Sequence, residues 1–150
     1  MAIIRITKAF NFEMAHALLG YKGPCKHIHG HSYELFVTVK GKPINSQESS
    51  ENGMLMDFGT LKNIIKSNII DEFDHSLVIN QNASAEFVAK SHDMFGKMHL
   101  VPYQPTIENM LEDFAERIKK LLPDDIQLFR LMLRETVTSY AEWFAEDNME

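Results

Sequence analysis

The chain has 150 residues, of which 45% are hydrophobic and 24% charged, and its formal net charge is −6. This composition favours a single folded domain over residues 1–150 rather than a disordered chain. The negative charge argues against a nucleic-acid-binding protein, because such binding depends mainly on Lys and Arg. The single cysteine excludes an internal disulfide, and no apolar run or leader pattern points to a membrane, so a cytoplasmic protein is expected.

The first 40 residues predict two strands separated by a loop. Residues 3–16 and 29–40 are rich in β-branched and aromatic side chains and alternate between two faces with a period of two. Residues 17–28 between them contain two glycines and a proline, which predicts a loop that carries Cys25.

Two amphipathic helices are expected further along the chain. Residues 58–73 carry apolar side chains at helical spacing, and Asp57 directly before them is a favourable N-cap. Residues 105–121 show a clearer apolar stripe, opened by a proline and a threonine and followed by another proline. Residues 80–104 show no strong pattern apart from a short stretch of helical character at 85–89, so a loop is expected there.

The C-terminal part predicts two more strands, residues 126–136 and 139–146, joined by a tight turn. The order of elements indicates an α+β fold, with a four-stranded antiparallel sheet covered on one face by two helices. Because the open edges of such a sheet can pair with another subunit, a homo-oligomer is expected.

Three histidines are candidates for a metal site. His29 and His31 lie two apart in one strand, and His16 ends the preceding strand on a face of matching parity. If the strands pair, three imidazoles converge and leave a fourth position open, the arrangement of a catalytic zinc site. Two surface histidines and an unrelated third are the alternative, because an H-x-H pattern alone is a weak signal.

Cys25 lies four residues before His29 in the predicted loop. As a fourth ligand it would close the zinc shell and make the site structural. As a free thiolate near Lys22, Lys26 and His27 it would act as a base or nucleophile. A small buried thiol is a third reading, which suits a loop position less well.

Asp74 and His75 directly follow the first predicted helix. A carboxylate beside an imidazole can fix its tautomer and raise its basicity, provided that the backbone turns so that the two side chains meet. A histidine that interacts with the helix dipole is the alternative.

Glu135 extends the apolar face expected for Phe129, Leu131 and Leu133, so its carboxylate is predicted to point inward. An unpaired charge would be costly there. Either a flat ligand with two parallel N–H donors or a salt bridge to a neighbouring arginine would satisfy it.

These motifs together resemble the 6-pyruvoyltetrahydropterin and 6-carboxytetrahydropterin synthase family. Each block is weak alone, but the combination is highly specific and runs through most of the chain in the family's order. The blocks are FNFEMAH with His16, CKHIHGHSYEL with Cys25, His29 and His31, MDF at residues 56–58, FDHSL with Asp74 and His75, PTIEN with Thr106 to Asn109, and LRET with Glu135. The departure is residues 80–104, which are longer than expected in short bacterial members and bring His92 and His99.

The resemblance implies a tunnelling fold, in which the sheets of several subunits join into a barrel within a trimer-based or hexameric assembly. It also implies a bound Zn²⁺ and a pterin substrate. By motif, the zinc ligands would be His16, His29 and His31, the proton-transfer residues Cys25, Asp74 and His75, and the substrate-binding residues Glu135, Thr106 and Glu108.

The substrate that the resemblance implies is 7,8-dihydroneopterin triphosphate, which would lose triphosphate and acetaldehyde to give 6-carboxy-5,6,7,8-tetrahydropterin. The short interval between Cys25 and His29 is similar to that of the bacterial carbon–carbon lyases of queuosine (7-deazapurine) biosynthesis. Two alternatives remain: a 6-pyruvoyltetrahydropterin synthase that eliminates triphosphate only, and a non-catalytic structural zinc module.

Overall fold

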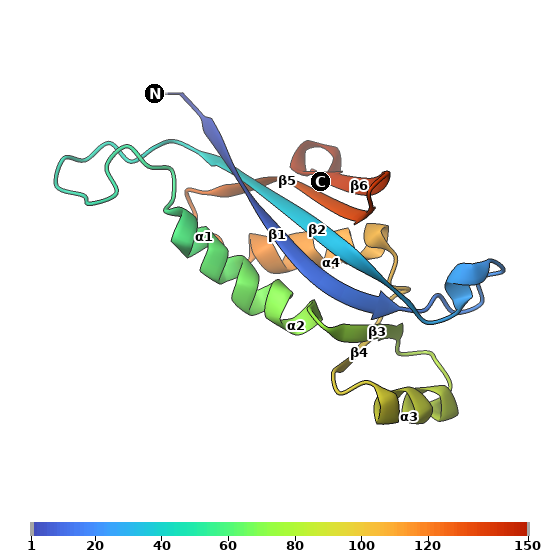
Figure 1. Cartoon of the computed structure of the whole chain (residues 1–150). Coiled ribbons are helices and arrows are strands. Elements are labelled where there is room, and N and C mark those ends of the chain that lie inside the picture. Colours follow the sequence, from blue (N-terminus) through green and yellow to red (C-terminus); the bar gives the residue numbers. More distant parts are fainter. Residues whose placement is uncertain (1, 150) are drawn as a thin grey trace.

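Six strands form one curled sheet in the computed structural model, which describes residues 2–149 (Figure 1). Their order across the sheet is β4-β3-β1-β2-β5-β6. The strands are β1 (Ile4–His16), β2 (His29–Gly41), β3 (Ser76–Asn80), β4 (Met98–Val101), β5 (Gln127–Thr136) and β6 (Ser139–Phe144). The helices are α1 (Phe58–Ile65), a π-helical segment (Lys66–Ile70), α2 (Asp71–Phe73), α3 (Ala85–Met94) and α4 (Ile107–Lys119), with short 3-10 turns at Pro24–Lys26 and Ala145–Asn148.

The long antiparallel pair β1–β2 confirms the first two predicted strands. Their register runs without a break from Ile4 opposite Gly41 to His16 opposite His29. Phe12 and Met14 on β1 are buried while Glu13 between them is exposed, as the period of two predicts. A slip of one residue would turn every one of these apolar side chains toward solvent, so the register is strongly specified.

The expectation of a four-stranded antiparallel sheet was wrong, because β3 and β4 extend the sheet with parallel pairs. β3 lies parallel to the end of β1, with Met14 opposite Ser76, and β4 lies parallel to β3. The first four residues of β3 are all buried, so they carry no alternation from which a strand could be predicted. The expected loop over residues 80–104 was also wrong, since it contains β4 and α3, whose N-cap Ser84 accepts a hydrogen bond from the Phe87 N–H at 3.1 Å.

The hairpin of β5 and β6 confirms the C-terminal prediction, with one local correction. Leu128 pairs with Val39 but Arg130 pairs with Thr38, so Phe129 is an extra residue at a bulge. Phe129 therefore does not share the inner face with Leu131; its ring instead lies 3.7 Å from the Arg5 guanidinium carbon.

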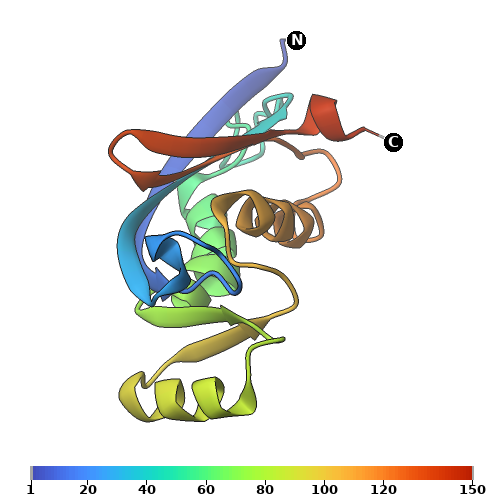
Figure 2. The same cartoon turned by 90° about the vertical axis from the view of Figure 1, so that its right-hand side faces the viewer.

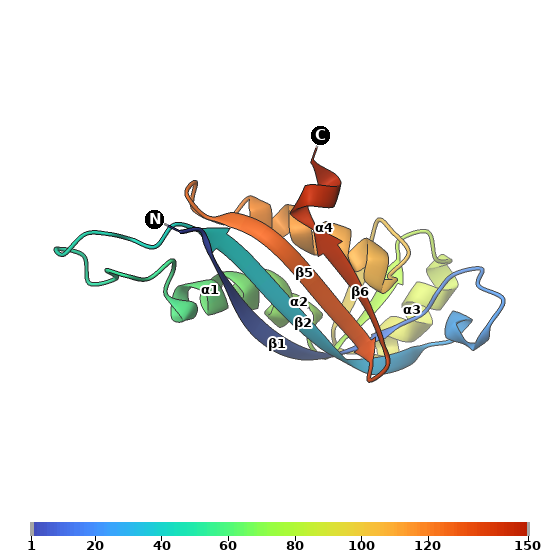
Figure 3. The same cartoon turned by 90° about the horizontal axis from the view of Figure 1, so that it is seen from above.

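The helices α1, α2 and α4 cover the concave face of the sheet, whereas α3 lies beside β3 and β4 (Figures 2 and 3). The helix predicted over residues 58–73 is continuous through the π-helical segment, and Asp57 caps it by accepting the Thr60 N–H at 3.1 Å. No helix within residues 2–149 has both the length and the apolar character needed to cross a membrane.

Phe114 on α4 packs against both the sheet and the helix α2. Its ring is fully buried, with centroids 5.1 Å from Phe73 and 6.4 Å from Phe12. We expect Phe114→Ala to lower the free energy of unfolding by about 3–5 kcal/mol, because it leaves a cavity between the sheet and two helices. Urea denaturation measures the change, with Leu121→Ala, at a residue 41% exposed, as the control. Equal losses in both variants would contradict this assignment of the core.

Candidate metal centre and pocket

Three imidazoles converge where β1 ends and β2 begins. The β1–β2 register places His16 directly opposite His29 and places Met14 opposite His31. One nitrogen from each of the three rings lies within 4.8 Å of the others. His16 is buried, and His29 and His31 are partly exposed, so the cluster has one closed side and one side open to a ligand.

Backbone carbonyls set the tautomers of two of these rings. The Nδ1 of His16 lies 2.7 Å from the Pro105 carbonyl, and the Nδ1 of His29 lies 2.7 Å from the His27 carbonyl. Since a carbonyl can only accept a hydrogen bond, both Nδ1 atoms carry the proton. The Nε2 atoms of His16 and His29, 3.0 Å apart, then face each other with lone pairs, an arrangement that a cation between them would stabilise.

The electrostatics of the cluster favour the neutral form of His16 and His31. Burial, together with the neighbouring His29 and His31, lowers the pKa of His16, although the Pro105 carbonyl and the Glu135 charge act to raise it. Burial likewise lowers the pKa of His31, although the negative charge of Glu135 acts to raise it. Neutral imidazole is the form that binds a metal ion.

The donor set fits Zn²⁺. Bonds of roughly 2.0–2.1 Å in a tetrahedral shell put the ligand nitrogens about 3.3 Å apart, close to the spacing of the facing Nε2 atoms. Carbonyl acceptors behind two of the rings provide the outer support that histidine ligands usually have. Three nitrogen ligands also leave room for a further ligand from the pocket.

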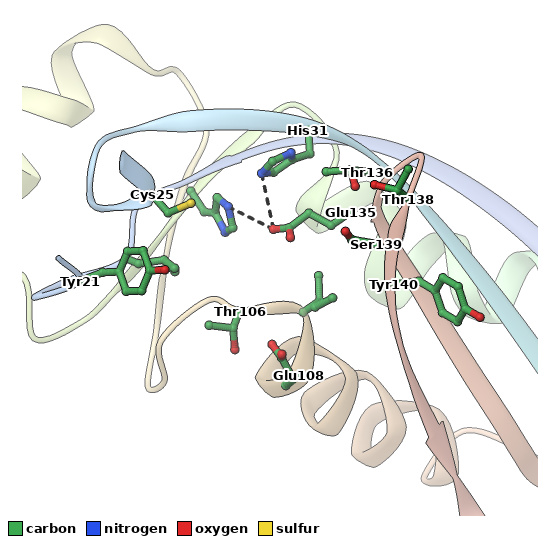
Figure 4. A pocket seen from close by; sticks show the side chains of 13 residues that line it. Tyr21, Cys25, His31, Thr106, Glu108, Glu135, Thr136, Thr138, Ser139 and Tyr140 are labelled. Carbon is green, nitrogen blue, oxygen red and sulfur yellow. Dashed lines mark ion pairs between the residues drawn. The ribbon is translucent and has the colours of Figure 1, made fainter. Parts of the chain in front are cut away.

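A pocket of about 680 Å³ opens beside the cluster (Figure 4). Cys25 and Tyr21 lie at one end of it, and the β5–β6 turn lies at the other. Its lining residues come from four parts of the chain: His16, Leu18, Tyr21, Cys25, His31, Thr106, Ile107, Glu108, Glu135, Thr136, Thr138, Ser139 and Tyr140. Residues from opposite ends of the sequence therefore form one concave surface.

Glu135 projects from the end of β5 toward the histidines, as Figure 4 shows. Its Oε1 lies 3.5 Å from the Nε2 of His16 and 3.5 Å from the Nε2 of His31. Within residues 2–149 no arginine forms a salt bridge with Glu135, so the arginine partner considered from the sequence is not present. The Glu135 side chain is 25% exposed and can therefore meet a ligand in the pocket.

Tyr33 lies beneath this carboxylate. Continuing the register that pairs Glu34 with Arg134 places Tyr33 opposite Glu135 on the inner face. The Tyr33 ring is fully buried and packs edge-on against His31, with centroids 5.6 Å apart. Burial, reinforced by the nearby charge of Glu135, raises the pKa of Tyr33, so the phenol keeps its proton.

Cys25 lines the pocket without joining the cluster of three nitrogens. It lies on the 3-10 turn at Pro24–Lys26 and is partly exposed. In the part of the chain that the structure describes, the side chains close enough to share one metal ion are His16, His29 and His31. The geometry thus gives the thiol access to a pocket ligand but does not place it as a fourth metal ligand.

Asp74 and His75 meet each other but do not line this pocket. The Nδ1 of His75 lies 3.0 Å from the Asp74 Oδ2, and the positive φ of His75, 59°, produces the turn that brings the adjacent side chains together. Burial raises the pKa of Asp74, but the Glu13 N–H, His75 and Lys97 together lower it by more. The pair thus forms a carboxylate–imidazole unit, with the His75 side chain 78% exposed.

The start of α4 forms another wall of the pocket. Thr106 caps the helix by accepting the Asn109 N–H at 3.3 Å, and Glu108 in the first turn is exposed; both line the pocket. His92 and His99 lie elsewhere: His92 is on α3, and the His99 Nε2 donates to the Glu72 carbonyl at 2.6 Å.

Sequence reasoning missed several parts of this site. It did not single out Thr136, Thr138, Ser139 or Tyr140, which border the pocket at the β5–β6 turn. Their hydroxyl groups and their position just after Glu135 were the only available signal. The role of the Pro105 carbonyl could not be found, because any residue carries such a group.

A family model described as 6-pyruvoyl tetrahydropterin synthase matches residues 5–146. The chain therefore belongs to this family. A 6-carboxy-5,6,7,8-tetrahydropterin synthase from Haemophilus influenzae is 32% identical over 143 residues, covering 94% of this chain and 99% of that protein. A synthase of the same name from Aquifex aeolicus is 33% identical over 164 residues, covering 94% of this chain and 98% of its own.

Solved structures share the fold. The 6-pyruvoyl tetrahydropterin synthase of Caenorhabditis elegans superposes with a TM-score of 0.67 at 22% identity, covering 97% of each chain. An uncharacterized protein from Wolinella succinogenes gives a TM-score of 0.73 at 18% identity, covering 97% of this chain and 99% of its own. At these identities the likeness establishes the architecture alone.

We expect His16→Ala, His29→Ala and His31→Ala each to weaken Zn²⁺ binding by more than roughly 100-fold. Losing only the hydrogen-bond partner behind a ligand already costs roughly 10- to 100-fold in affinity, and loss of the ligand itself should cost more. Calorimetric titration of the chelator-treated protein measures the affinity. His99→Ala is the matched control and should bind as the wild type does, because His99 contacts Glu72 instead of the cluster. Unchanged affinity in one of the three variants would remove that histidine from the metal site.

Proposed function

We propose that this protein is a zinc-dependent carbon–carbon lyase of queuosine biosynthesis. It converts 7,8-dihydroneopterin triphosphate and water to 6-carboxy-5,6,7,8-tetrahydropterin, acetaldehyde and triphosphate. The observation that carries the proposal is the pair of facing Nε2 atoms of His16 and His29, 3.0 Å apart, beside a pocket that His16 lines together with Glu135 and Cys25. Relatives named 6-carboxy-5,6,7,8-tetrahydropterin synthase over nearly their full length support the choice of product.

In this proposal His16, His29 and His31 hold the zinc ion. When bound, Zn²⁺ would supply Lewis-acid chemistry, polarising the oxygens of the substrate side chain and making the adjoining C–H more acidic. The protein's contribution is orientation: the Pro105 and His27 carbonyls fix two rings so that their Nε2 atoms point toward one position.

Glu135 is proposed to anchor the pterin ring. A carboxylate accepts two parallel N–H donors, and the amide and amino groups on one edge of a pterin present such donors. Thr106 and Glu108, at the start of α4, are proposed as further substrate contacts because they border the same pocket. The Glu135 Oε1 lies 3.5 Å from the Nε2 atoms of His16 and His31, so a pterin held by this carboxylate would lie beside the proposed metal site.

Cys25 is proposed as the base that removes a proton from the substrate side chain. It borders the pocket but lies outside the histidine cluster, so it is free to exchange a proton. Its partly exposed position in the loop allows the proton to pass on to solvent.

The Asp74–His75 pair is proposed to act on the pocket of a neighbouring copy in a homo-oligomer. It does not line the pocket of its own chain, yet its two side chains contact each other and its imidazole is exposed. Two strands can receive a neighbour. β6 is an outer strand of the sheet, and β1 pairs with β3 only at Met14 to His16, which leaves the rest of that side of β1 without a partner strand in residues 2–149. A copy docked along such an edge would bring a second proton donor and acceptor to the site.

Product analysis tests the proposed reaction. The zinc-loaded protein, incubated with 7,8-dihydroneopterin triphosphate, should release acetaldehyde and triphosphate in equal amounts and yield the carboxylated pterin. Chromatography with mass detection identifies the products. Exclusive formation of the pyruvoyl product would reject the carbon–carbon lyase, and no turnover of any dihydropterin would favour a structural zinc module.

The matched control for this experiment is Cys25→Ala. As a base, Cys25 can be removed with little change in zinc content, while turnover falls by roughly a hundredfold or more. Loss of zinc together with activity would instead identify the thiol as a metal ligand.

We expect Glu135→Gln to weaken pterin binding at a cost on the order of a few kcal/mol, because one acceptor becomes a donor facing the N–H groups of the ligand. Fluorescence titration with a dihydropterin that lacks the triphosphate measures the affinity. Glu34→Gln is the control, since Glu34 neighbours Tyr33 in β2 and points to the opposite face of the sheet. Wild-type affinity in Glu135→Gln would show that the carboxylate contacts the histidines but does not bind the pterin.

A further inference from the structure

The loop that carries Cys25 has few contacts to hold it. Most of residues 17–28 are exposed. Inside the loop, the Leu18 N–H donates to the Cys25 carbonyl at 3.0 Å, and Gly20, with φ of 71°, permits the turn between them. This hydrogen bond closes the loop on itself, so the position of the thiol relative to the pocket depends on contacts from other parts of the chain.

The Gln104 side chain provides such a contact. Its Oε1 accepts the Leu19 N–H at 3.1 Å, and its Nε2 donates to the Leu19 carbonyl at 2.8 Å. One primary amide thus satisfies both backbone groups of a loop residue, as a neighbouring strand would. Leu19 directly follows Leu18, so the clamp lies next to the hydrogen bond that holds Cys25.

Gln104 is itself fixed at the entrance to α4. Its carbonyl accepts the Thr106 N–H at 2.7 Å and the Asn109 side-chain N–H at 2.9 Å. The next residue, Pro105, accepts the hydrogen bond from His16 through its carbonyl. Three consecutive residues therefore hold the cysteine loop, a histidine of the cluster and the wall of the pocket.

We propose that Gln104 is a positioning residue that holds the Cys25 thiol at the pocket through Leu19. It acts on the loop and leaves the metal centre unchanged, because the histidine contact uses the Pro105 carbonyl, which no side-chain substitution at 104 removes. The consequence for turnover rests on the proposed role of Cys25 as the base, whereas the effect on the loop does not.

The clamp needs a side chain that both donates and accepts. In Gln104→Glu the carboxylate still accepts the Leu19 N–H, but the Leu19 carbonyl loses its donor and meets a negative charge. Gln104→Met keeps the length of the side chain and removes both hydrogen bonds. Gln47→Glu introduces the same charge in the loop between β2 and α1, at the opposite end of the molecule from the Cys25 loop, and serves as the control (Figure 1).

Hydrogen exchange and thiol alkylation test the clamp without reference to catalysis. Exchange of the Leu19 amide should accelerate roughly tenfold in Gln104→Met, the factor that corresponds to one lost hydrogen bond. Because the chain has one cysteine, iodoacetamide reports Cys25 alone, and its rate as a function of pH should differ from wild type in both Gln104 variants. Zinc stoichiometry should stay unchanged, while kcat falls by on the order of a hundredfold.

The outcomes separate the two proposals. Wild-type amide exchange and a wild-type alkylation profile in both Gln104 variants would overturn the clamp, as would loss of zinc from Gln104→Met. If the wild-type protein turns over no dihydropterin, the proposed reaction fails, but the exchange and alkylation data still decide whether Gln104 positions Cys25.

Discussion

The unbroken antiparallel register of β1 with β2 is the constraint on which the rest of the site depends. It fixes His16 opposite His29 and leaves His31 on the same face two residues later. The register is held by the apolar side chains that alternate along both strands into the core, with Phe12 stacked on Tyr33 at 5.0 Å. Core packing and the histidine cluster thus depend on the same pair of strands, so a histidine cannot shift without moving the core.

The entrance to α4 is the second organising element. Gln104, Pro105 and Thr106 contact the Cys25 loop, the His16 ring and the pocket through different atoms. The helix that follows is anchored by buried side chains such as Phe114 and Ile118. The buried part of α4 therefore fixes the polar N-terminal end of the helix. That end in turn holds the exposed Cys25 loop, which makes few other contacts, against the pocket.

The sequence predicted the elements whose side chains alternate or recur with a clear period. This covers β1, β2, α4 and the β5–β6 hairpin, together with the convergence of the histidines, which follows from strand parity. It failed for β3, where Ser76–Asn80 is buried almost throughout and carries no period, and for the four-residue β4. The bulge at Phe129 and the left-handed backbone of His75 were also inaccessible, because both arise from pairing and turns that composition does not encode.

The π-helical segment Lys66–Ile70 has a consequence for how this chain tolerates change in length. Its wide turn buries the consecutive residues Ile69 and Ile70 and still delivers Phe73 to the core. Removing one residue from this segment would restore a regular α-helix and leave the residues on either side in their present orientation, because the wide turn already takes up one extra residue. Phe73 would stay in the core, and Asp74 would keep its hydrogen bond from the Glu13 N–H. The same deletion within the regular α1 would rotate everything after it by about 100° and turn the carboxylate–imidazole pair away from β1.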